Sequence, residues 1–401
     1  MKKLFQKYFF INLNNLNKSS ASIKFLMYLT ISLFFNTPVL TISKKRALNS
    51  PTIPIVKQYV QRFMRKYKIP GMAVALYVHN TPYIFHFGYA NRENKIPVTR
   101  ATLFEIGSIS KVFTCILIAQ EILANRMQLH DAISDHIYFL KNNQRLNTMT
   151  IEQLCTHTAA LPYDVPVDIS SKESLLRHMI KWRPATKQAI YRYSNHGIEL
   201  LRLALEESTR KTINMLFTER ILVPLNMSAI GVVVPENYKI YYAKCYDKSG
   251  KLTTYWDRER PLLLGSGGLR ATSIDMLNFM QATIGLANTP HDLDQAIKLT
   301  QTPHVKIGNL KHGLGWTMDN LSTNQIGGLT GRLAEKIHTD QRFFSGNYLF
   351  DKTGTTNGFQ AYIGVVPNQK IGIVLMANKR LPNGWKIIKK FGKELLRKTS
   401  K

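Results

Sequence analysis

Acidic residues, cysteines and long apolar runs are all scarce in this sequence. It has 25 Asp and Glu residues against 54 Lys and Arg residues, which gives a formal net charge of +29. Its three cysteines, Cys115, Cys155 and Cys245, are an odd number without metal-ligand spacing, so we expect no cysteine-based metal site and at most one disulfide within the chain. The apolar run near its start, Phe25 to Phe35, has eleven residues, whereas a membrane-spanning helix needs roughly 20.

The basic excess bears on possible partners. Such a charge favours anionic surroundings such as nucleic acid, acidic lipid or cell-wall polymers, although net charge alone does not report function. The basic residues are scattered and no nucleic-acid-binding motif accompanies them, so we expect no nucleic-acid partner. A hydrophobic content of 44% and a charged content of 20% are typical of a folded protein, and 401 residues suffice for a substantial core.

The first 45 residues are typical of an export segment. Five lysines precede the apolar run, whose length suits the core of a secretory signal peptide. No clean cleavage site follows it, so two interpretations stay open. A cleaved signal peptide predicts a secreted, periplasmic protein. An uncleaved N-terminal anchor is the one case in which we expect contact with a membrane.

Strand patterns lie at both ends of the chain, with short helices between them. The spacing of apolar residues predicts helices at 52–67, 112–129 and 385–398, a hairpin at 71–91 with its turn at residues 79–82, and strands at 359–366 and 371–378. We therefore expect an α+β fold in which both ends share one antiparallel sheet flanked by helices. Residues 50–401 would form one catalytic domain. Its sheet lobe would span roughly 50–125 and 300–401, its helical lobe 126–299, and a cleft would separate the lobes.

Three short motifs carry candidate chemistry. The first, in FEIGSISKVFT, places Ser108 three residues before Lys111 at the start of a helix, where the two side chains share a face. A serine hydroxyl becomes a good nucleophile when a neutral amine within hydrogen-bond reach takes its proton. The alternative is a helix-capping serine, because the same spacing recurs at Ser208 and Lys211 without other chemical residues nearby.

The second and third motifs are Tyr193-Ser194-Asn195 and Lys352-Thr353-Gly354. A tyrosine beside two lysines would have a lowered pKa, and an asparagine can bind an amide through both its donor and its acceptor. A strand with lysine, a hydroxyl and glycine offers a cation, a hydrogen bond and close backbone approach to a ligand. The alternatives are a capping asparagine with a packed tyrosine, and a turn between two strands.

The order of these motifs resembles the serine β-lactamases and penicillin-binding proteins, whose signature combines S-x-x-K with K-T-G. The Y-S-N element, together with IEQLCTHTAALP, GLGWTM and IGIVLMANKRLPN, looks like the class C β-lactamases from about residue 55 to the C-terminus. The resemblance implies a β-lactamase/transpeptidase-like fold. It also implies a monomeric hydrolase that confers antibiotic resistance by opening penicillins or cephalosporins, with no cofactor or metal.

The resemblance also implies roles for individual residues. Ser108 would attack the lactam carbonyl, and Lys111 and Tyr193 would share the proton transfers in a division that the sequence leaves open. Backbone N–H groups of Ser108 and Thr355 would bind the oxyanion. Lys352 would supply positive charge. The residues expected to bind the substrate are Asn195 at its acylamide, Thr353 at its carboxylate, Gly354 and Thr355 along the strand, and Asn383 near the carboxylate end.

Three positions depart from the class C pattern and keep alternatives open. Asp164 stands where glutamine is frequent and would disfavour anionic side chains, although it could also be an exposed loop residue without contacts. Asp351 precedes the K-T-G, and GSGGL at 265–269 resembles peptidase and esterase relatives. A DD-peptidase or esterase acting on D-alanyl cell-wall peptides or small esters is therefore the alternative function. A non-hydrolytic penicillin-binding sensor is a third, which four intact catalytic residues disfavour.

Overall fold

The computed structural model describes residues 50–141, 146, 148–166, 168–183, 189–227, 231–234, 236–256, 262–322, 330–337 and 347–401. The fold is that of the compact unit Thr52–Lys401. The export segment predicted for residues 1–45 lies outside the described residues. Within the described ranges, no helix combines the length and apolar character that crossing a bilayer requires.

The described residues form one ten-stranded sheet and a separate two-stranded ribbon. The ribbon pairs β4 (Phe104–Glu105) with β5 (Arg270–Ala271). The strands of the main sheet are β1 (Gly71–Val78), β2 (Thr81–Asn91), β3 (Ile96–Pro97), β6 (Val305–Ile307), β7 (Leu310–His312), β8 (Thr317–Asp319), β9 (Glu335–Lys336), β10 (Leu349–Thr355), β11 (Gln360–Val366) and β12 (Ile371–Ala377). Their spatial order is β3-β2-β1-β12-β11-β10-β8-β7-β6-β9.

Both ends of the unit meet in this sheet, as the sequence predicts. Met72 of β1 pairs antiparallel with Ala377 of β12, and β12 pairs antiparallel with β11. β1, β11 and β12 are buried along their whole length, because each carries a continuous run of apolar residues that suits a central strand covered on both faces. The α+β fold with strands from both chain ends is therefore confirmed.

The turn of the first hairpin is shorter than predicted. β1 and β2 pair up to Val78 and Thr81, so only His79 and Asn80 form the connection, with φ angles of 50° and 55°. Two consecutive positive φ angles are typical of the tight turn that matches the twist of a hairpin. The prediction that Thr81 and Pro82 belong to the turn is wrong, because both continue into β2.

Some helices of the described residues flank the sheet and others form a separate helical part. They are α4 (Thr52–Tyr67), α5 (Ser110–Leu123), α6 (Ile133–His136), α7 (Ile151–Cys155), α8 (Lys172–Lys181), α9 (Asn195–Thr209), α10 (Ile213–Phe217), α12 (Leu264–Gly267), α13 (Ser273–Thr283), α14 (His291–Thr300) and α15 (Gly384–Thr399). α5 ends earlier than the apolar pattern predicts, because Asn125 turns left-handed with φ 56° just after it.

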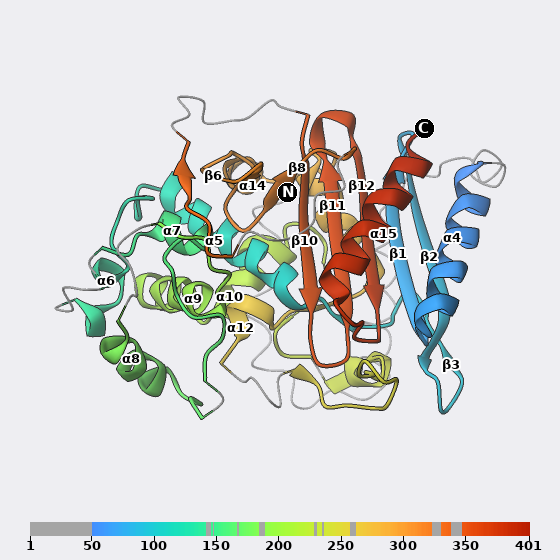
Figure 1. The fold of residues 1–401 in the computed structure, drawn as a ribbon, viewed down its shortest axis with the longest axis horizontal. Coiled ribbons are helices and arrows are strands. Elements are labelled where there is room, and N and C mark those ends of the chain that lie inside the picture. Colours follow the sequence, from blue (N-terminus) through green and yellow to red (C-terminus); the bar gives the residue numbers. More distant parts are fainter. Residues whose placement is uncertain are drawn as a thin grey trace, which may run out of the picture. The chain divides into compact units, whose positions relative to one another are not determined.

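α4 and α15 cover one face of the sheet together (Figure 1). The rings of Phe63 and Phe391 stack between the two helices at a centroid distance of 3.9 Å. Lys389 of α15 forms a buried ion pair with Asp351 of β10 at 2.9 Å. This pair gives Asp351, one of the three departures from the class C pattern, a structural contact on the face away from the motif serine.

The opposite face packs against a larger core that contains α5 and the short helices. α13 lies against β1 and β12, and α5 contacts α9, α12 and α14. α5 is buried from Ser110 to Ala119, so its start is held rigidly between the sheet and the helical part. The three cysteines are buried free thiols, and Cys115 lies within this core as predicted.

Candidate active site

Ser108 lies in a single 3₁₀ turn, Gly107–Ile109, directly before α5. The residues that cap this turn and α5 are Ile106 and Ile109, so the interpretation of Ser108 as a helix cap is wrong. Gly107 has φ 51°, and a Cβ atom on it would lie 2.9 Å from the backbone nitrogen of Thr355. Glycine is therefore required where the serine turn meets β10.

Lys111 is completely buried and surrounded by oxygen atoms. Its Nζ lies 3.1 Å from Ser108 Oγ, 2.6 Å from Asn195 Oδ1 and 2.7 Å from the carbonyl oxygen of Ser266. Burial, with the nearby charge of Lys352, holds the pKa of Lys111 well below its usual value. The neutral amine is therefore easier to reach at Lys111 than at a solvent-exposed lysine.

The three contacts orient that amine toward the serine. Two of the oxygens, Asn195 Oδ1 and the Ser266 carbonyl, can only accept hydrogen bonds. A neutral amine has two N–H bonds and one lone pair, so both N–H bonds go to these carbonyl oxygens. The lone pair is then left for the hydroxyl hydrogen of Ser108. The arrangement is that of a nucleophile with its base.

Tyr193 lies between the two lysines of the motifs. Its ring centroid is 5.1 Å from Lys111 Nζ and 4.9 Å from Lys352 Nζ. Burial raises the pKa of the Tyr193 phenol well above its usual value, although its hydrogen bond with Ser108 acts in the opposite direction. The prediction of a lowered pKa is wrong, because burial of the phenol outweighs the effect of this hydrogen bond. Tyr193 is thus a protonated phenol and a hydrogen-bond donor.

Lys352, Thr353 and Gly354 lie within β10 rather than in a turn, so the turn interpretation is wrong. Burial lowers the pKa of Lys352 to about 8. A Cβ atom on Gly354 would lie 1.9 Å from the Ile106 carbonyl oxygen, so only glycine allows β10 to approach the serine turn. In the described residues, β8 pairs with β10 no further than Asp351, and this leaves the edge from Lys352 onward beside Ser108.

Asn195 links Lys111 to Asp164. Its Nδ2 donates to Asp164 Oδ1 at 3.1 Å while its Oδ1 accepts from Lys111. The residue that caps α9 is Ser194, whose hydroxyl accepts from Gly197 N–H at 3.3 Å. Both alternatives, a capping Asn195 and an Asp164 without contacts, are therefore wrong.

Asn383 is the predicted site residue that the described structure does not join to this cluster. It is exposed, caps α15 with φ 48°, and makes no side-chain capping bond. It does lie at the same end of the sheet as Thr355, because Thr355 pairs with Gln360 and Gln360 pairs with Ala377. Its role in substrate binding stays a prediction.

Sequence reasoning missed residues that hold the cluster from behind. The buried carboxylate of Glu199 accepts from Ser266 N–H at 2.8 Å, which fixes the carbonyl that binds Lys111. His157 packs on Tyr193 at a ring distance of 4.3 Å and accepts from Ser194 N–H at 3.3 Å. The only signals in the sequence were the glycine corner around Ser266 and the four-residue spacing from Asn195 to Glu199, which places both on one helix face.

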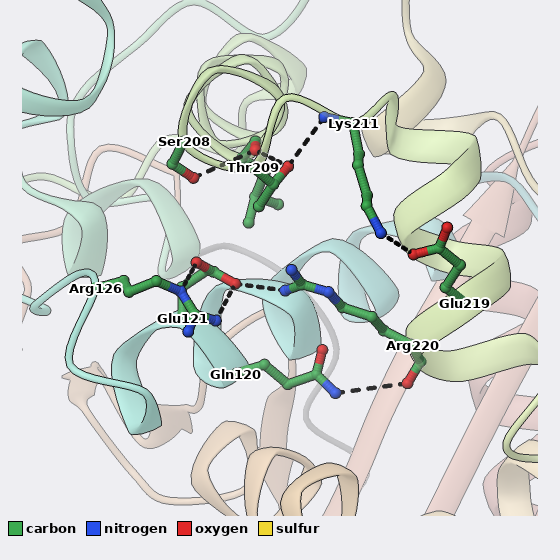
Figure 2. Close-up of polar contacts among 9 residues, drawn as sticks. Gln120, Glu121, Arg126, Ser208, Thr209, Lys211, Glu219 and Arg220 are labelled. Carbon is green, nitrogen blue, oxygen red and sulfur yellow. Dashed lines mark hydrogen bonds and ion pairs between the residues drawn. The ribbon is translucent and has the colours of Figure 1, made fainter.

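The second Ser-x-x-Lys segment forms no such cluster (Figure 2). Ser208 donates to the Leu205 carbonyl within its own helix at 3.3 Å. The ammonium of Lys211, 41% exposed, pairs instead with the Glu219 carboxylate. The hydroxyl and the amine thus have separate partners, and this segment is structural.

Two hollows in the described residues lie elsewhere than the cleft expected between the lobes. The larger one, about 400 Å³, lies between α13, α14 and the connection from β11 to β12. Ala282, Gln301 and Lys370 are among its lining residues, and none of the motif residues lines it. The candidate site is therefore defined by the contacts among the motif residues and not by a cavity.

Comparisons with known proteins agree with this geometry. A family profile described as Beta-lactamase matches residues 56–389 of this chain. A beta-lactamase of Yersinia enterocolitica is 30% identical over 374 residues, which cover 89% of this chain and 94% of that protein.

Two solved structures extend the likeness to the fold. A beta-lactamase/D-alanine carboxypeptidase from Pseudomonas syringae has a TM-score of 0.79 and 25% identity, and the match covers 87% of this chain and 99% of that one. A structure described as a class C beta-lactamase has a TM-score of 0.78 and 28% identity, with 86% and 96% covered. The resemblance inferred from the order of the motifs is confirmed.

Proposed function

Because this chain belongs to the beta-lactamase family, we propose that it is a serine hydrolase that opens β-lactam rings through an acyl-enzyme on Ser108. The observation that carries the proposal is the set of oxygens around Lys111, which leaves the lone pair of a neutral amine for the Ser108 hydroxyl. This gives the serine a base within hydrogen-bond reach.

Acylation follows from these positions. Ser108 Oγ attacks the lactam carbonyl carbon as its proton passes to Lys111 Nζ. The backbone N–H groups of Ser108 and Thr355 stabilise the oxyanion, since preformed donors act strongly where charge develops. When the C–N bond breaks, the ring nitrogen takes a proton from the Tyr193 phenol, and Lys111 returns its own proton to the tyrosine. The raised pKa of Tyr193 supports this division, in which the lysine is the first base.

Deacylation uses the same groups and a water molecule. Lys111 accepts a proton from water as the water oxygen attacks the ester carbon, and Tyr193 helps to activate that water through a hydrogen bond. Lys111 then returns the proton to Ser108 Oγ as the serine leaves. Lys352 keeps positive charge beside Tyr193 at neutral pH, because its pKa is about 8. Each proton transfer in this scheme uses side chains of the chain or water.

The substrate would lie along the free edge of β10. Lys352 and Thr353 would bind its carboxylate, and Gly354 and Thr355 would run beside its backbone. Asn383, at the same end of the sheet, would approach the carboxylate. Asn195 would bind the acylamide carbonyl or N–H group, and the charge of Asp164 next to it would favour cationic or neutral side chains over anionic ones.

A DD-peptidase or esterase is the second candidate. The name of the Pseudomonas syringae relative joins both activities, and the glycine corner around Ser266, which resembles peptidase and esterase relatives, also supports this candidate. Both candidates share acylation and differ in deacylation, which is fast in a lactamase and slow when a peptidase meets penicillin.

Burst kinetics with a chromogenic cephalosporin tests the proposal, using the chain without residues 1–50. Steady turnover by the wild type and by Ser208→Ala, with none by Ser108→Ala, is the expected result. A burst of one equivalent that then stalls would favour the peptidase. Reaction that survives in Ser108→Ala would overturn the Ser108 acyl-enzyme.

We also propose that the chain is exported to the periplasm by its N-terminal segment and acts there as a monomer. The five lysines and the eleven-residue apolar run support the export. Intact mass of the protein from a periplasmic extract is expected to show loss of about the first 45 residues, as the composition of a signal peptide predicts. A full-length protein in the membrane fraction would favour the uncleaved anchor.

A further inference from the structure

Gln360 is a buried polar residue that the mechanism above does not use. It is the first residue of β11, is fully shielded from solvent, and pairs in register with Thr355 of β10. Its Nε2 donates to the Gly354 carbonyl oxygen at 2.8 Å and to Thr355 Oγ1 at 2.8 Å. The first acceptor is the carbonyl of the peptide group whose N–H is the proposed oxyanion donor. The second acceptor is the side chain of Thr355, the residue that carries this N–H.

The bond to Gly354 acts on one peptide group. The carbonyl of Gly354 and the N–H of Thr355 are the two ends of the same planar amide, and they point in opposite directions. A donor held on the carbonyl fixes the plane of that amide. It also polarises the amide, and hydrogen bonds in series strengthen one another by roughly 10–30%. Gln360 therefore sets both the direction and the strength of the Thr355 N–H.

The surroundings of Gln360 determine which way its amide points. The Gly354 carbonyl can only accept, so the NH₂ group must face it. The opposite atom, Oε1, is buried without a hydrogen-bond partner among the described residues and faces the start of α15. A Cβ atom on Gly384 would lie 1.9 Å from it, so glycine at this position makes room for the amide. The positive end of the helix dipole suits an oxygen there.

We propose that Gln360 is a positioning residue for the oxyanion hole, acting through the Gly354–Thr355 peptide. The inference rests on the proposed function and deepens it. It assigns the stabilisation of the tetrahedral intermediate to three parts: the Ser108 N–H, the Thr355 N–H and the Gln360 amide behind it. Gln360 touches neither substrate nor the reacting atoms.

The test compares Gln360→Met with the wild type. Methionine keeps the volume and removes the donor, so the single-turnover acylation rate constant is expected to fall about tenfold. That is less than the roughly 10²–10³-fold cost of deleting an oxyanion donor outright. The dissociation constant of the unreacted cephalosporin is expected to stay unchanged. Affinity for a boronic acid, whose serine adduct places an oxygen in the hole, is expected to fall by the same factor as acylation.

Gln301→Met is the matched control. Gln301 is also buried and its Nε2 donates to a backbone carbonyl, that of Thr283, at 3.0 Å, but it lies outside the candidate site. This variant is expected to lose stability in the same way while keeping the acylation rate and the boronic acid affinity of the wild type. An equal rate loss in both variants would overturn the inference, because it would trace the effect to folding.

Gln360→Glu is a second variant in case methionine impairs folding. A carboxylate cannot donate to the Gly354 carbonyl, whereas a carboxylic acid can. Acylation relative to the wild type is therefore expected to recover as pH falls and the acid becomes protonated. A ratio that does not change with pH, or a Gln360→Met enzyme with wild-type acylation, would overturn the inference. Failure of the wild type itself to acylate at Ser108 would instead overturn the proposed function, so the two failures are distinguishable.

Discussion

Two segments of this chain share the pattern Ser-x-x-Lys, Ser108 to Lys111 and Ser208 to Lys211, and their surroundings differ in almost every respect. Lys111 is fully buried and lies 3.1 Å from its serine. Lys211 is 41% exposed and pairs with Glu219, while Ser208 binds a carbonyl of its own helix. Spacing alone brings a hydroxyl and an amine near the same helix face. Burial and the choice of partners decide whether they can react.

The two lysines differ in the groups that contact them besides the motif serine. At the first segment, Asn195 and the Ser266 carbonyl arrive from other elements and accept both N–H bonds of the amine. At the second, the exposed side chain of Lys211 forms an ion pair with the Glu219 carboxylate. Burial, together with the charge of Lys352, lowers the pKa of Lys111.

Removing each lysine is the strongest way to test the comparison. Lys111→Met is expected to lower kcat/KM for a cephalosporin by about 10²–10⁴-fold, the usual contribution of a general base. Lys211→Met, the matched control, is expected to leave kcat/KM unchanged and to alter the free energy of unfolding by less than about 1 kcal/mol, as for other exposed ion pairs. Similar activities for the two variants would remove Lys111 from the mechanism.

Glu121 tests whether burying a charged group is enough by itself to contribute to catalysis. It lies near the second segment, fully buried, and binds Arg126 at 2.7 and 2.9 Å as well as Arg220 (Figure 2). Glu121→Gln is expected to lower the free energy of unfolding at pH 7 by about 2 kcal/mol, because charged partners lose their hydrogen bonds. kcat/KM is expected to stay unchanged. Denaturant unfolding measures the first quantity, with Glu219→Gln as the exposed control.

The pH dependence of that difference has a definite sign. Burial acts to raise the pKa of Glu121, and the bonds from Arg126 and Arg220 outweigh it, so the folded pKa lies below the usual 4.5. The stabilisation is therefore complete above pH 4.5 and is lost as pH falls through the lower, folded value. The gap between wild type and Glu121→Gln should narrow in acid. A gap that widens in acid would contradict the assignment.

Lys352 sharpens the comparison through the alkaline limb that it gives to the pH profile of kcat/KM. Its pKa is lowered to about 8 by burial, so its charge is lost as pH rises past that value. kcat/KM of the wild type is expected to fall about tenfold between pH 7 and pH 9. Lys352→Arg keeps its charge throughout this range, and its profile, whatever its height, should stay flat to pH 9. A wild-type limb that persists in the arginine variant would belong to another group.

Asp164 gives the smallest expected effect. Its charge acts to raise the pKa of Lys111, so Asp164→Asn should move the acid limb of kcat/KM to lower pH. It should also raise the preference for substrates with anionic over neutral side chains by about threefold, the effect of one partly screened charge. Paired substrates that differ in that charge measure this. A preference that stays unchanged would place the aspartate outside the reach of the substrate side chain.

The fold was predictable where long apolar runs decide the structure. β1, β11 and β12 have such runs, α4 and α15 have apolar residues at helical spacing, and all five were predicted. The short strands β6, β7, β8 and β9 were not, since two or three residues carry no periodicity. The end of α5 was missed because it depends on the backbone of Asn125 and not on a change of pattern.

The site was predictable where residue types and their order carry the information, and only there. Ser108, Lys111 and Asn195 were identified this way, and they do meet in the structure. The carbonyl of Ser266 was missed because every residue has one and only the fold selects it. The raised pKa of Tyr193 was missed because its burial arises from residues far apart in the sequence.

The pairing of β1 with β12 has a consequence for when the enzyme can form. Met72 faces Ala377 across this pair. β1 is therefore synthesised early but cannot pair with β12 until nearly the whole chain has been made. Non-local pairings of this kind delay folding, and Lys389 of α15 must also arrive before Asp351 of β10 is neutralised. A chain with this order of strands cannot complete its central sheet until its synthesis is nearly finished. The order of strands that places Lys352 beside Ser108 therefore also determines when the sheet can form.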